Sequence, residues 1–186
     1  MFFLGIKLEI EGNLDESCDL ILINHQSMLD IIVMEHLHNR NIAWVAKKEI
    51  TDLFFFGHII KAPRMISIDR ENKAGLIHLL SEAKDRLSKG RPIAMFPEGT
   101  RSDGTYIGEF KAGAKMVGNK FNLKVQPVVM FNTRNIVNSQ KMEAAPGVVK
   151  VVYLEPVLAS KDTSWYEDCE KNMKEVFEKE YKNYVS

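Results

Sequence analysis

Apolar and polar residues along this chain alternate in patterns that predict short strands separated by helices. From Ile6 to Glu11, apolar residues alternate with charged ones, which is the period-two pattern of a half-buried strand. The run from Leu20 to Ile23 is wholly apolar, as in a central strand that is covered on both faces. Similar runs predict strands at residues 42–46, 65–69, 92–96, 125–131 and 148–154.

Helical periodicity fills the stretches between these strands. Leu29, Val33 and Leu37 recur at helical spacing after Ser27, a residue type that often caps the first turn of a helix. Strands that alternate with helices predict an α/β fold with a mixed, mainly parallel central sheet flanked by helices. Because the 186 residues contain no linker or repeat, we expect a single domain over residues 1–186. Further helices are expected at residues 47–60, 76–87, 111–120 and 165–184.

Composition narrows the class of protein. With 45% hydrophobic and 27% charged residues, the chain is neither a disordered tail nor a polytopic membrane protein. Two cysteines are too few for a disulfide framework, and no histidine or cysteine spacing indicates a metal site. The sequence has no run of 18 apolar residues, so no membrane-spanning helix is expected.

The 25 basic and 25 acidic residues balance, but they are unevenly distributed along the chain. Residues 1–30 carry a net charge of −5, residues 31–60 are neutral, residues 61–150 carry +8, and residues 151–186 carry −3. The zero total argues against a nucleic-acid partner, because such proteins usually carry a basic excess. The basic middle could bind an anionic ligand, and chance clustering of solvated charges is the alternative.

Polar clusters directly follow three of the predicted strands, at residues 24–30, 69–73 and 97–101. In α/β sheets, ligands bind in the crevice at the carboxyl ends of the strands. We therefore expect these three clusters to converge at one edge of the sheet and to form a binding site there.

The first cluster contains His25 and, five residues later, Asp30. A carboxylate beside an imidazole holds one tautomer and stabilises the imidazolium that forms when the ring takes up a proton. This pair could serve as a general base for a substrate that brings its own hydroxyl group. Alternatively, Asp30 only favours the positive end of a helix and His25 caps that helix.

The later cluster, residues 96–102, reads Phe-Pro-Glu-Gly-Thr-Arg-Ser. Gly99 permits close approach of the backbone to a ligand, and Arg101 has the planar fork that suits a phosphate or a carboxylate. Arg70 follows another strand at the same expected edge. A plain polar turn with a surface ion pair is the alternative. Further cations that could reach this edge are Lys47 and Lys111.

These strings, in this order and spacing, resemble the glycerophospholipid acyltransferase family over roughly residues 5–160. The resemblance rests on His25 and Asp30, the Ile-Asp-Arg string ending at Arg70, and residues 96–102. Residues 125–129 are similar to a fourth motif of the family, with a less usual Gln126. The subgroup that the chain resembles is the bacterial 1-acylglycerol-3-phosphate acyltransferases, which implies a glycerol-3-phosphate acyltransferase-like fold.

The resemblance implies an activity and a role for each matching residue. An acyl chain would move from a thioester to the free hydroxyl of 1-acylglycerol 3-phosphate (lysophosphatidic acid), giving phosphatidic acid. His25 would be the catalytic base, oriented by Asp30. Glu98 would repel a phosphate, so we expect it to fix an arginine or bind a hydroxyl. The expected substrate-binding residues are Arg70, Glu98, Gly99, Thr100 and Arg101, with Lys47 and Lys111 as weaker candidates.

The same resemblance implies partners and a location. Acyl-CoA or acyl carrier protein would be the co-substrate, no cofactor or metal is expected, and the protein would act peripherally at the cytoplasmic face of the inner membrane. The subgroup usually has an apolar N-terminal membrane segment, whereas 24 residues precede His25 here, as in a trimmed chain or a short member. The aromatic stretch at residues 53–57 could contact the membrane or could belong to the core.

The sequence leaves other functions open. The same His/Asp pair could activate water, which would make the protein an acyl-thioesterase. The acceptor could be another lysophospholipid or glycerol 3-phosphate. A module that binds anionic lipid without catalysis is a third possibility.

Overall fold

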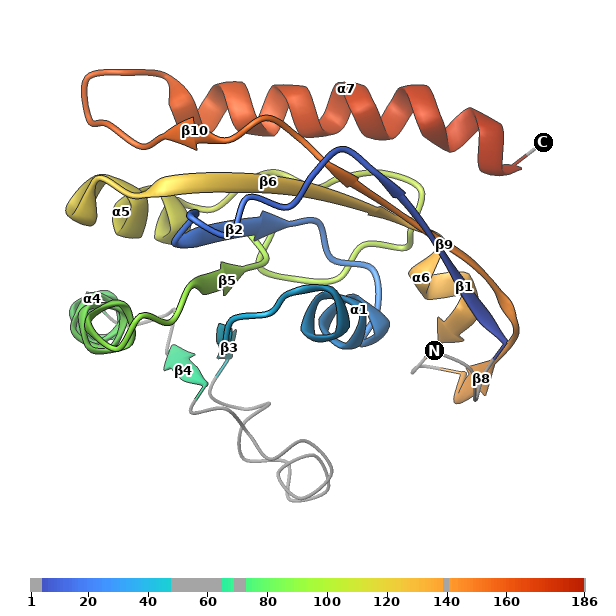
Figure 1. Ribbon diagram of the computed structural model, residues 1–186, viewed down its shortest axis with the longest axis horizontal. Helices are drawn as coiled ribbons and strands as arrows, with labels where there is room; N and C mark the ends of the chain where they lie inside the picture. Colours follow the sequence, from blue (N-terminus) through green and yellow to red (C-terminus); the bar gives the residue numbers. More distant parts are fainter. Residues whose placement is uncertain (1–4, 48–64, 69–72, 139–140, 186) are drawn as a thin grey trace.

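A central β-sheet organises the computed structural model, which describes residues 5–47, 65–68, 73–138 and 141–185 (Figure 1). The strand order is β1-β9-β6-β2-β5-β3-β4, and β10 pairs with β6 outside this path. Within this sheet, the pairs that the described residues form are parallel, except for β6 with β9 and β6 with β10. The strands are β1 (Ile6–Glu11), β2 (Leu20–Ile23), β3 (Ala43–Lys47), β4 (Ile66–Ile68), β5 (Ile93–Met95), β6 (Lys124–Phe131), β9 (Gly147–Tyr153) and β10 (Val157–Leu158). The mixed, mainly parallel α/β architecture expected from the sequence is confirmed.

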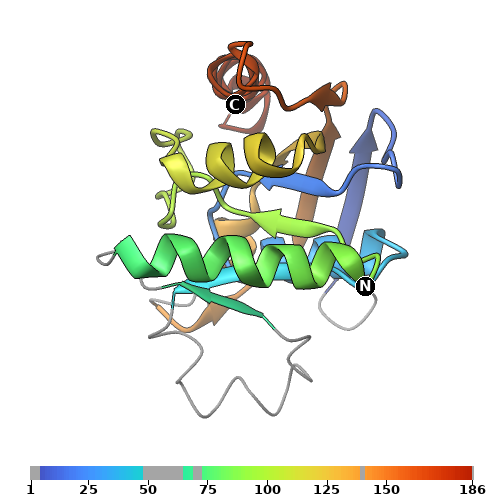
Figure 2. The same ribbon diagram turned by 90° about the vertical axis from the view of Figure 1, so that its left-hand side faces the viewer.

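Helices cover both faces of this sheet. Leu20 and Leu22 of β2 belong to a core shared with α4, α5 and α7, whereas Ile21 and Ile23 point to a second core shared with α1 and α6. Figure 2 shows α7, α5 and α4 one after another from top to bottom. The helices are α1 (Leu29–Leu37), α4 (Lys73–Ser88), α5 (Ala112–Phe121), α6 (Thr133–Ile136) and α7 (Trp165–Val185).

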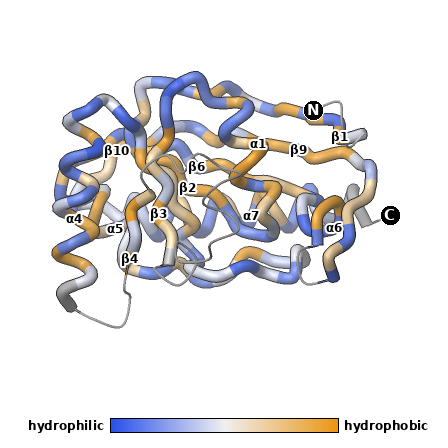
Figure 3. The backbone as a smooth tube through the Cα atoms, turned by 90° about the horizontal axis from the view of Figure 1, so that it is seen from below, coloured by the Kyte–Doolittle hydropathy of each residue, from blue (hydrophilic) through white to orange (hydrophobic). Residues whose placement is uncertain are grey.

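The apolar pattern of β2 explains its central position. All four of its residues are completely buried, as expected for a strand with helices on both faces. Figure 3 shows the hydrophobic strands in the interior of the molecule and the hydrophilic stretches mainly around it. Because β2 pairs in parallel with both β5 and β6, the carboxyl ends of these three strands meet at one edge of the sheet.

Some predicted details are wrong. Helix α1 begins one residue later than a Ser27 cap implies, with Met28 as its N-cap, although the Ser27 hydroxyl still accepts the backbone N–H of Leu29 at 3.2 Å while it donates to the carbonyl of Val137 at 2.6 Å. Helix α4 begins at Lys73, three residues before its predicted start. Four short elements were not predicted because they are too short to show periodicity: α6, β10, β7 (Val137–Asn138) and β8 (Glu143–Ala144). Lys47, the first residue of the helix expected at 47–60, belongs to β3 instead, and the rest of that helix, with the aromatic stretch at 53–57, lies outside the described residues.

Candidate active site

Two of the polar clusters meet at the carboxyl ends of β2 and β5. The backbone N–H of His25 donates to Glu98 Oε1 at 2.7 Å, and its carbonyl accepts from the backbone N–H of Ser102 at 2.8 Å. Both backbone groups of His25, the N–H and the carbonyl, therefore join the segment after β2 to the loop after β5. The expected convergence of these clusters is confirmed, whereas residues 69–72 of the third cluster lie outside the described part of the chain.

His25 and Asp30 form a close pair. His25 Nδ1 lies 2.8 Å from Asp30 Oδ2, and the two side chains are 12% and 0% exposed. Since Nδ1–H is the donor that a carboxylate requires, the lone pair of the ring lies on Nε2. The small exposed fraction of the imidazole gives solvent or substrate a path to the ring. The pair can therefore accept a proton at Nε2 and stabilise the resulting cation.

Asp30 is buried but richly hydrogen-bonded. Its Oδ2 also accepts the backbone N–H groups of Gln26 at 2.8 Å and Ser27 at 2.9 Å, and its Oδ1 accepts the hydroxyl of Thr133. These donors offset the cost of burying a negative charge. Asp30 thus supports the turn before α1 and the imidazole together. The His25 ring bonds to Asp30 instead of capping α1, and the general-base role of the pair stays a prediction.

Aromatic packing fixes the plane of the imidazole. The His25 ring stacks on Phe96, with centroids 3.7 Å apart and an interplanar angle of 13°. Phe96 in turn stacks on Trp44 at 5.4 Å, and the Trp44 indole N–H donates to Glu35 at 2.6 Å. The carboxylate on one side and the ring stack on the other leave the imidazole little freedom to rotate.

Glu98 holds the loop that follows β5. Its side chain is buried, and its two carboxylate oxygens accept the backbone N–H groups of His25 at 2.7 Å and Gly108 at 2.6 Å. Burial raises the pKa of Glu98, although the two N–H donors oppose this effect. The structure therefore gives Glu98 a role in positioning the loop, and its binding of an arginine or a substrate hydroxyl stays a prediction.

The remaining predicted binding residues lie around the same loop. Gly99 has φ +75°, which a glycine adopts without strain, and Thr100 and Arg101 follow it, exposed and half-buried. Lys111 is 64% exposed, and its Nζ lies 3.9 Å from Glu109 Oε2. Its backbone N–H donates to the carbonyl of Pro97 at 2.8 Å, which closes the base of the loop. The side chain of Lys47, at the end of β3, and all of Arg70 lie outside the described part.

Sequence reasoning missed two residues at this site. The amide of Asn24 pairs with the backbone of Met130 in both directions, at 2.7 and 3.0 Å, and so continues the contact of β2 with β6. Thr133 reaches Asp30 from beyond the end of β6. One sequence pattern could have indicated Asn24 and Thr133: each is a polar residue just after an apolar strand that ends at the same edge of the sheet.

Gln126, the less usual residue of the fourth motif, has a structural role. It is completely buried in β6, and its Oε1 accepts the backbone N–H of Asp15 at 2.7 Å. Its Nε2 donates to the carbonyl of Leu154 at 2.5 Å. Gln126 therefore fastens two connecting segments to the sheet, near the start of β6 and away from the His25 pair.

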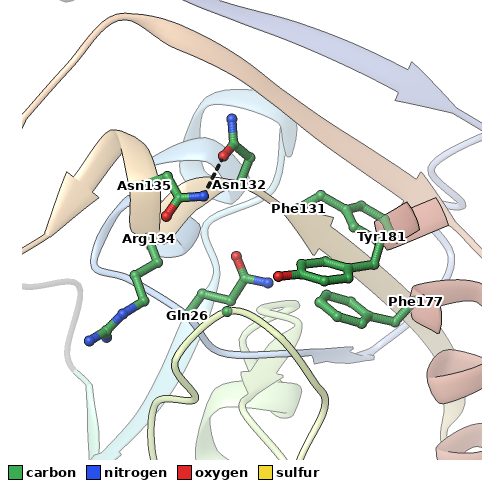
Figure 4. Close-up of a pocket in the computed structure, with 8 residues that line it drawn as sticks. Gln26, Phe131, Asn132, Arg134, Asn135, Phe177 and Tyr181 are labelled. Carbon is green, nitrogen blue, oxygen red and sulfur yellow. Dashed lines mark hydrogen bonds between the residues drawn. The ribbon is translucent and has the colours of Figure 1, made fainter. Parts of the chain in front are cut away.

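A small cavity of about 30 Å³ has Gln26, the residue after His25, in its lining (Figure 4). Gln26 and Arg134 line it on one side and the aromatic rings of Phe131, Phe177 and Tyr181 on the other. This volume is enough for one or two water molecules. Within the described ranges, no cluster of three or more metal-ligating side chains occurs. None of the helices described is both long and apolar enough to cross a membrane.

The sequence of this chain matches those of known proteins. The acyltransferase family model matches residues 6–131. The chain is 42% identical over 182 residues to the 1-acyl-sn-glycerol-3-phosphate acyltransferase of Helicobacter pylori, which covers 95% of this chain and 76% of that protein. It is 31% identical over 138 residues to a lyso-ornithine lipid O-acyltransferase of Brucella abortus, covering 70% of this chain and 51% of that protein.

A solved structure has the same fold. The 1-acyl-sn-glycerophosphate acyltransferase of Thermotoga maritima matches with a TM-score of 0.75, over 98% of this chain and 74% of that chain. The two sequences are 24% identical, so this match concerns the fold alone.

Proposed function

The chain belongs to the acyltransferase family, and we propose that it transfers an acyl chain from a thioester to 1-acyl-sn-glycerol 3-phosphate, giving phosphatidic acid. The observation that carries this proposal is the His25–Asp30 pair, held at 2.8 Å at the carboxyl edge of the sheet. The 42% identity to a relative named for this reaction supports the choice of acceptor.

In the proposed reaction, His25 acts as the general base. Its Nε2 removes the proton from the free hydroxyl of the acceptor while that oxygen attacks the thioester carbonyl carbon. The new C–O bond forms, the C–S bond breaks, and the thiol leaves with the proton that His25 carried. General-base catalysis of this kind contributes about 10²- to 10⁴-fold to a rate.

Asp30 orients the base and stabilises it once it is charged. The hydrogen bond from Nδ1–H to Asp30 keeps Nε2 unprotonated before the attack. After the attack, the negative charge of Asp30 lies beside the imidazolium. The stack on Phe96 keeps the ring in the same plane through both stages.

The phosphate of the acceptor would bind near the loop after β5. Arg101 is the proposed bidentate partner, and Arg70, Lys47 and Lys111 would add positive charge. Gly99 and Thr100 would bring backbone close to the ligand, and the net charge of +8 over residues 61–150 supports an anionic acceptor.

The proposal extends to donor and location. The acyl donor is acyl-CoA or acyl carrier protein, with no further cofactor, since the thioester itself supplies the leaving group. Because the acceptor and the product are lipids, the protein would work at a membrane surface, at the cytoplasmic face of the inner membrane. A nucleic-acid partner is not part of the proposal.

An acceptor panel tests the function. The purified protein is given palmitoyl-CoA or palmitoyl-acyl carrier protein, and thiol release and lipid products are followed with and without each acceptor. We expect thiol release that depends on 1-acyl-glycerol 3-phosphate, together with equal formation of phosphatidic acid. The other acceptors are glycerol 3-phosphate and lyso-ornithine lipid, and the second is included because of the Brucella relative.

Three outcomes would contradict this proposal. Thiol release that ignores every acceptor would show a thioesterase. Faster transfer to another acceptor of the panel would change the assigned substrate. Lipid binding without thiol release from either donor would show a binding module rather than an enzyme.

A further inference from the structure

We propose that Thr133 is a positioning residue of the active site, which holds Asp30 so that Asp30 can hold His25. This inference rests on the proposed function, because it assigns His25 the role of base. Thr133 does not touch the reacting atoms, and its effect passes through the carboxylate. The family motifs at His25, Asp30 and residues 96–102 do not include it.

The two oxygens of Asp30 have separate tasks. Oδ2 accepts from His25 Nδ1 and from two backbone N–H groups, all at 2.8–2.9 Å. Oδ1 accepts from the hydroxyl of Thr133, and both side chains are completely buried. Without that hydroxyl, Oδ1 would lose the donor that the structure gives it in a place where a charged oxygen is costly to leave unpaired.

The Thr133 hydroxyl donates its hydrogen bond to Asp30. A hydroxyl has one proton, and Thr133 Oγ1 lies within bonding distance of Asp30 Oδ1 and, at 3.2 Å, of Gln26 Oε1. The carboxylate is the shorter contact and the charged acceptor, so it takes the proton. Thr133 therefore acts as a donor toward the catalytic pair.

The fold determines the position of Thr133. Strand β6 lies beside β2 and runs parallel to it, so its carboxyl end reaches the edge where His25 lies. The Asn24 amide ties the end of β2 to Met130 of β6. Asn132 then turns the chain with φ +68°, and Thr133 begins α6. These restraints bring Thr133 to Asp30 across 103 residues of sequence.

The test compares variants of Thr133 in the acceptor-dependent assay. Thr133→Val keeps the volume but removes the donor, and we expect kcat to fall about 10- to 100-fold, the range of one hydrogen bond to a charged group. The KM for the acceptor should stay within about twofold. Thr133→Ser restores the hydroxyl and should return kcat to near the wild-type value, with Thr133→Cys, a weaker donor, between them.

The pH profile separates positioning from a general loss of structure. Without the Thr133 donor, the charge of Asp30 is concentrated toward the imidazole, so the acidic limb of the kcat profile should move to higher pH in Thr133→Val and not in Thr133→Ser. Ile136→Val is the matched control. It removes one methylene from a residue that is buried in the same helix and makes no hydrogen bond through its side chain, so kcat and its profile should not change.

The failure of this inference can be told from failure of the proposed function. If His25→Ala abolishes transfer but Thr133→Val keeps the wild-type kcat and pH profile, Thr133 has no positioning role. If His25→Ala retains transfer, the proposed mechanism itself is wrong. If Thr133→Val does not fold, the Ser and Cys variants decide, and equal kcat values for these two would overturn the proposal.

Discussion

At the scale of single residues, the proposed mechanism depends most directly on the charge of Asp30. Its carboxylate accepts four hydrogen bonds, and one of its donors is the imidazole of His25. An asparagine could keep much of this geometry, since its oxygen could take the place of Oδ2 and its amide nitrogen could face the Thr133 oxygen. The variant would differ mainly in charge.

Asp30→Asn should therefore reduce kcat by roughly 10²- to 10⁴-fold without a large change in folding. The physical reason is that the imidazolium of the proposed mechanism would lose its negative partner. Single-turnover transfer measures the rate, and thermal unfolding checks the fold. Comparable rates for Asp30→Asn and the wild type would show that His25 does not become charged during the reaction.

Arg101 offers a second test at this scale. Arg101→Ala should raise the KM for 1-acyl-glycerol 3-phosphate roughly 10- to 100-fold and change kcat less, because the phosphate would lose its proposed bidentate partner. Arg101→Lys, which keeps the charge but not the fork, should fall between. Initial rates over a range of acceptor concentrations give both constants, and an unchanged KM would mean that the phosphate binds elsewhere.

At the scale of elements, the loop between β5 and α5 depends on Glu98. Its two oxygens receive one N–H from the segment after β2 and one from Gly108 within the loop. Glutamine has one acceptor and one donor at its tip, so in Glu98→Gln one backbone N–H would face another donor. The loop would lose one of its two attachments.

Glu98→Gln should lower the free energy of unfolding by about 1–3 kcal/mol near neutral pH. Denaturant titrations of both proteins at neutral pH measure this difference, and equal free energies of unfolding would contradict it.

The contact between α5 and α7 depends on a small residue. A Cβ at Gly118 would lie 2.6 Å from Trp165 Cζ2 and 2.8 Å from Cη2, and the indole is held by a hydrogen bond to Asn119 at 2.7 Å. At Gly113 in the same helix, a Cβ would meet its nearest neighbours, Met95 and Leu79, at 3.7 and 3.8 Å, which is ordinary contact.

Gly118→Ala should therefore destabilise the protein by about 1–3 kcal/mol, although alanine favours helices. Gly113→Ala, the matched control, should stay within about 1 kcal/mol of the wild type. Thermal unfolding compares the three proteins. Equal stabilities of the two variants would show that Trp165 moves aside without cost.

At the scale of the whole molecule, the main features of the sheet were predictable because strong patterns carry them. The ranges of β1, β2 and α1 follow directly from alternation, from an apolar run and from helical spacing. The meeting of His25 with the loop after β5 followed from the rule that ligands bind at the carboxyl ends of parallel strands. The sequence could supply the ranges because each depends on local residues, and it could supply the meeting because that rule holds for parallel sheets in general.

Other features depend on the order of the strands, which no local pattern shows. Thr133 becomes relevant only because β6 lies beside β2, and Asn24 only because its amide meets Met130 there. The Ser27 hydroxyl likewise donates to the carbonyl of Val137, 110 residues away, while it accepts the nearby backbone N–H of Leu29. Contacts between residues this far apart in the sequence form only once the sheet is assembled.

The distance along the chain between Asp30 and Thr133 also has a consequence for protein synthesis. A ribosome makes the chain from its N-terminus, so the His25–Asp30 string emerges long before the residue that completes the bonds of its carboxylate. A chain released between residue 102 and β6 would carry that string and the whole of residues 96–102, yet it would lack both β6, the strand beside β2, and the Thr133 hydroxyl. A nascent or truncated chain can thus display the signature of the enzyme before it has the chemistry.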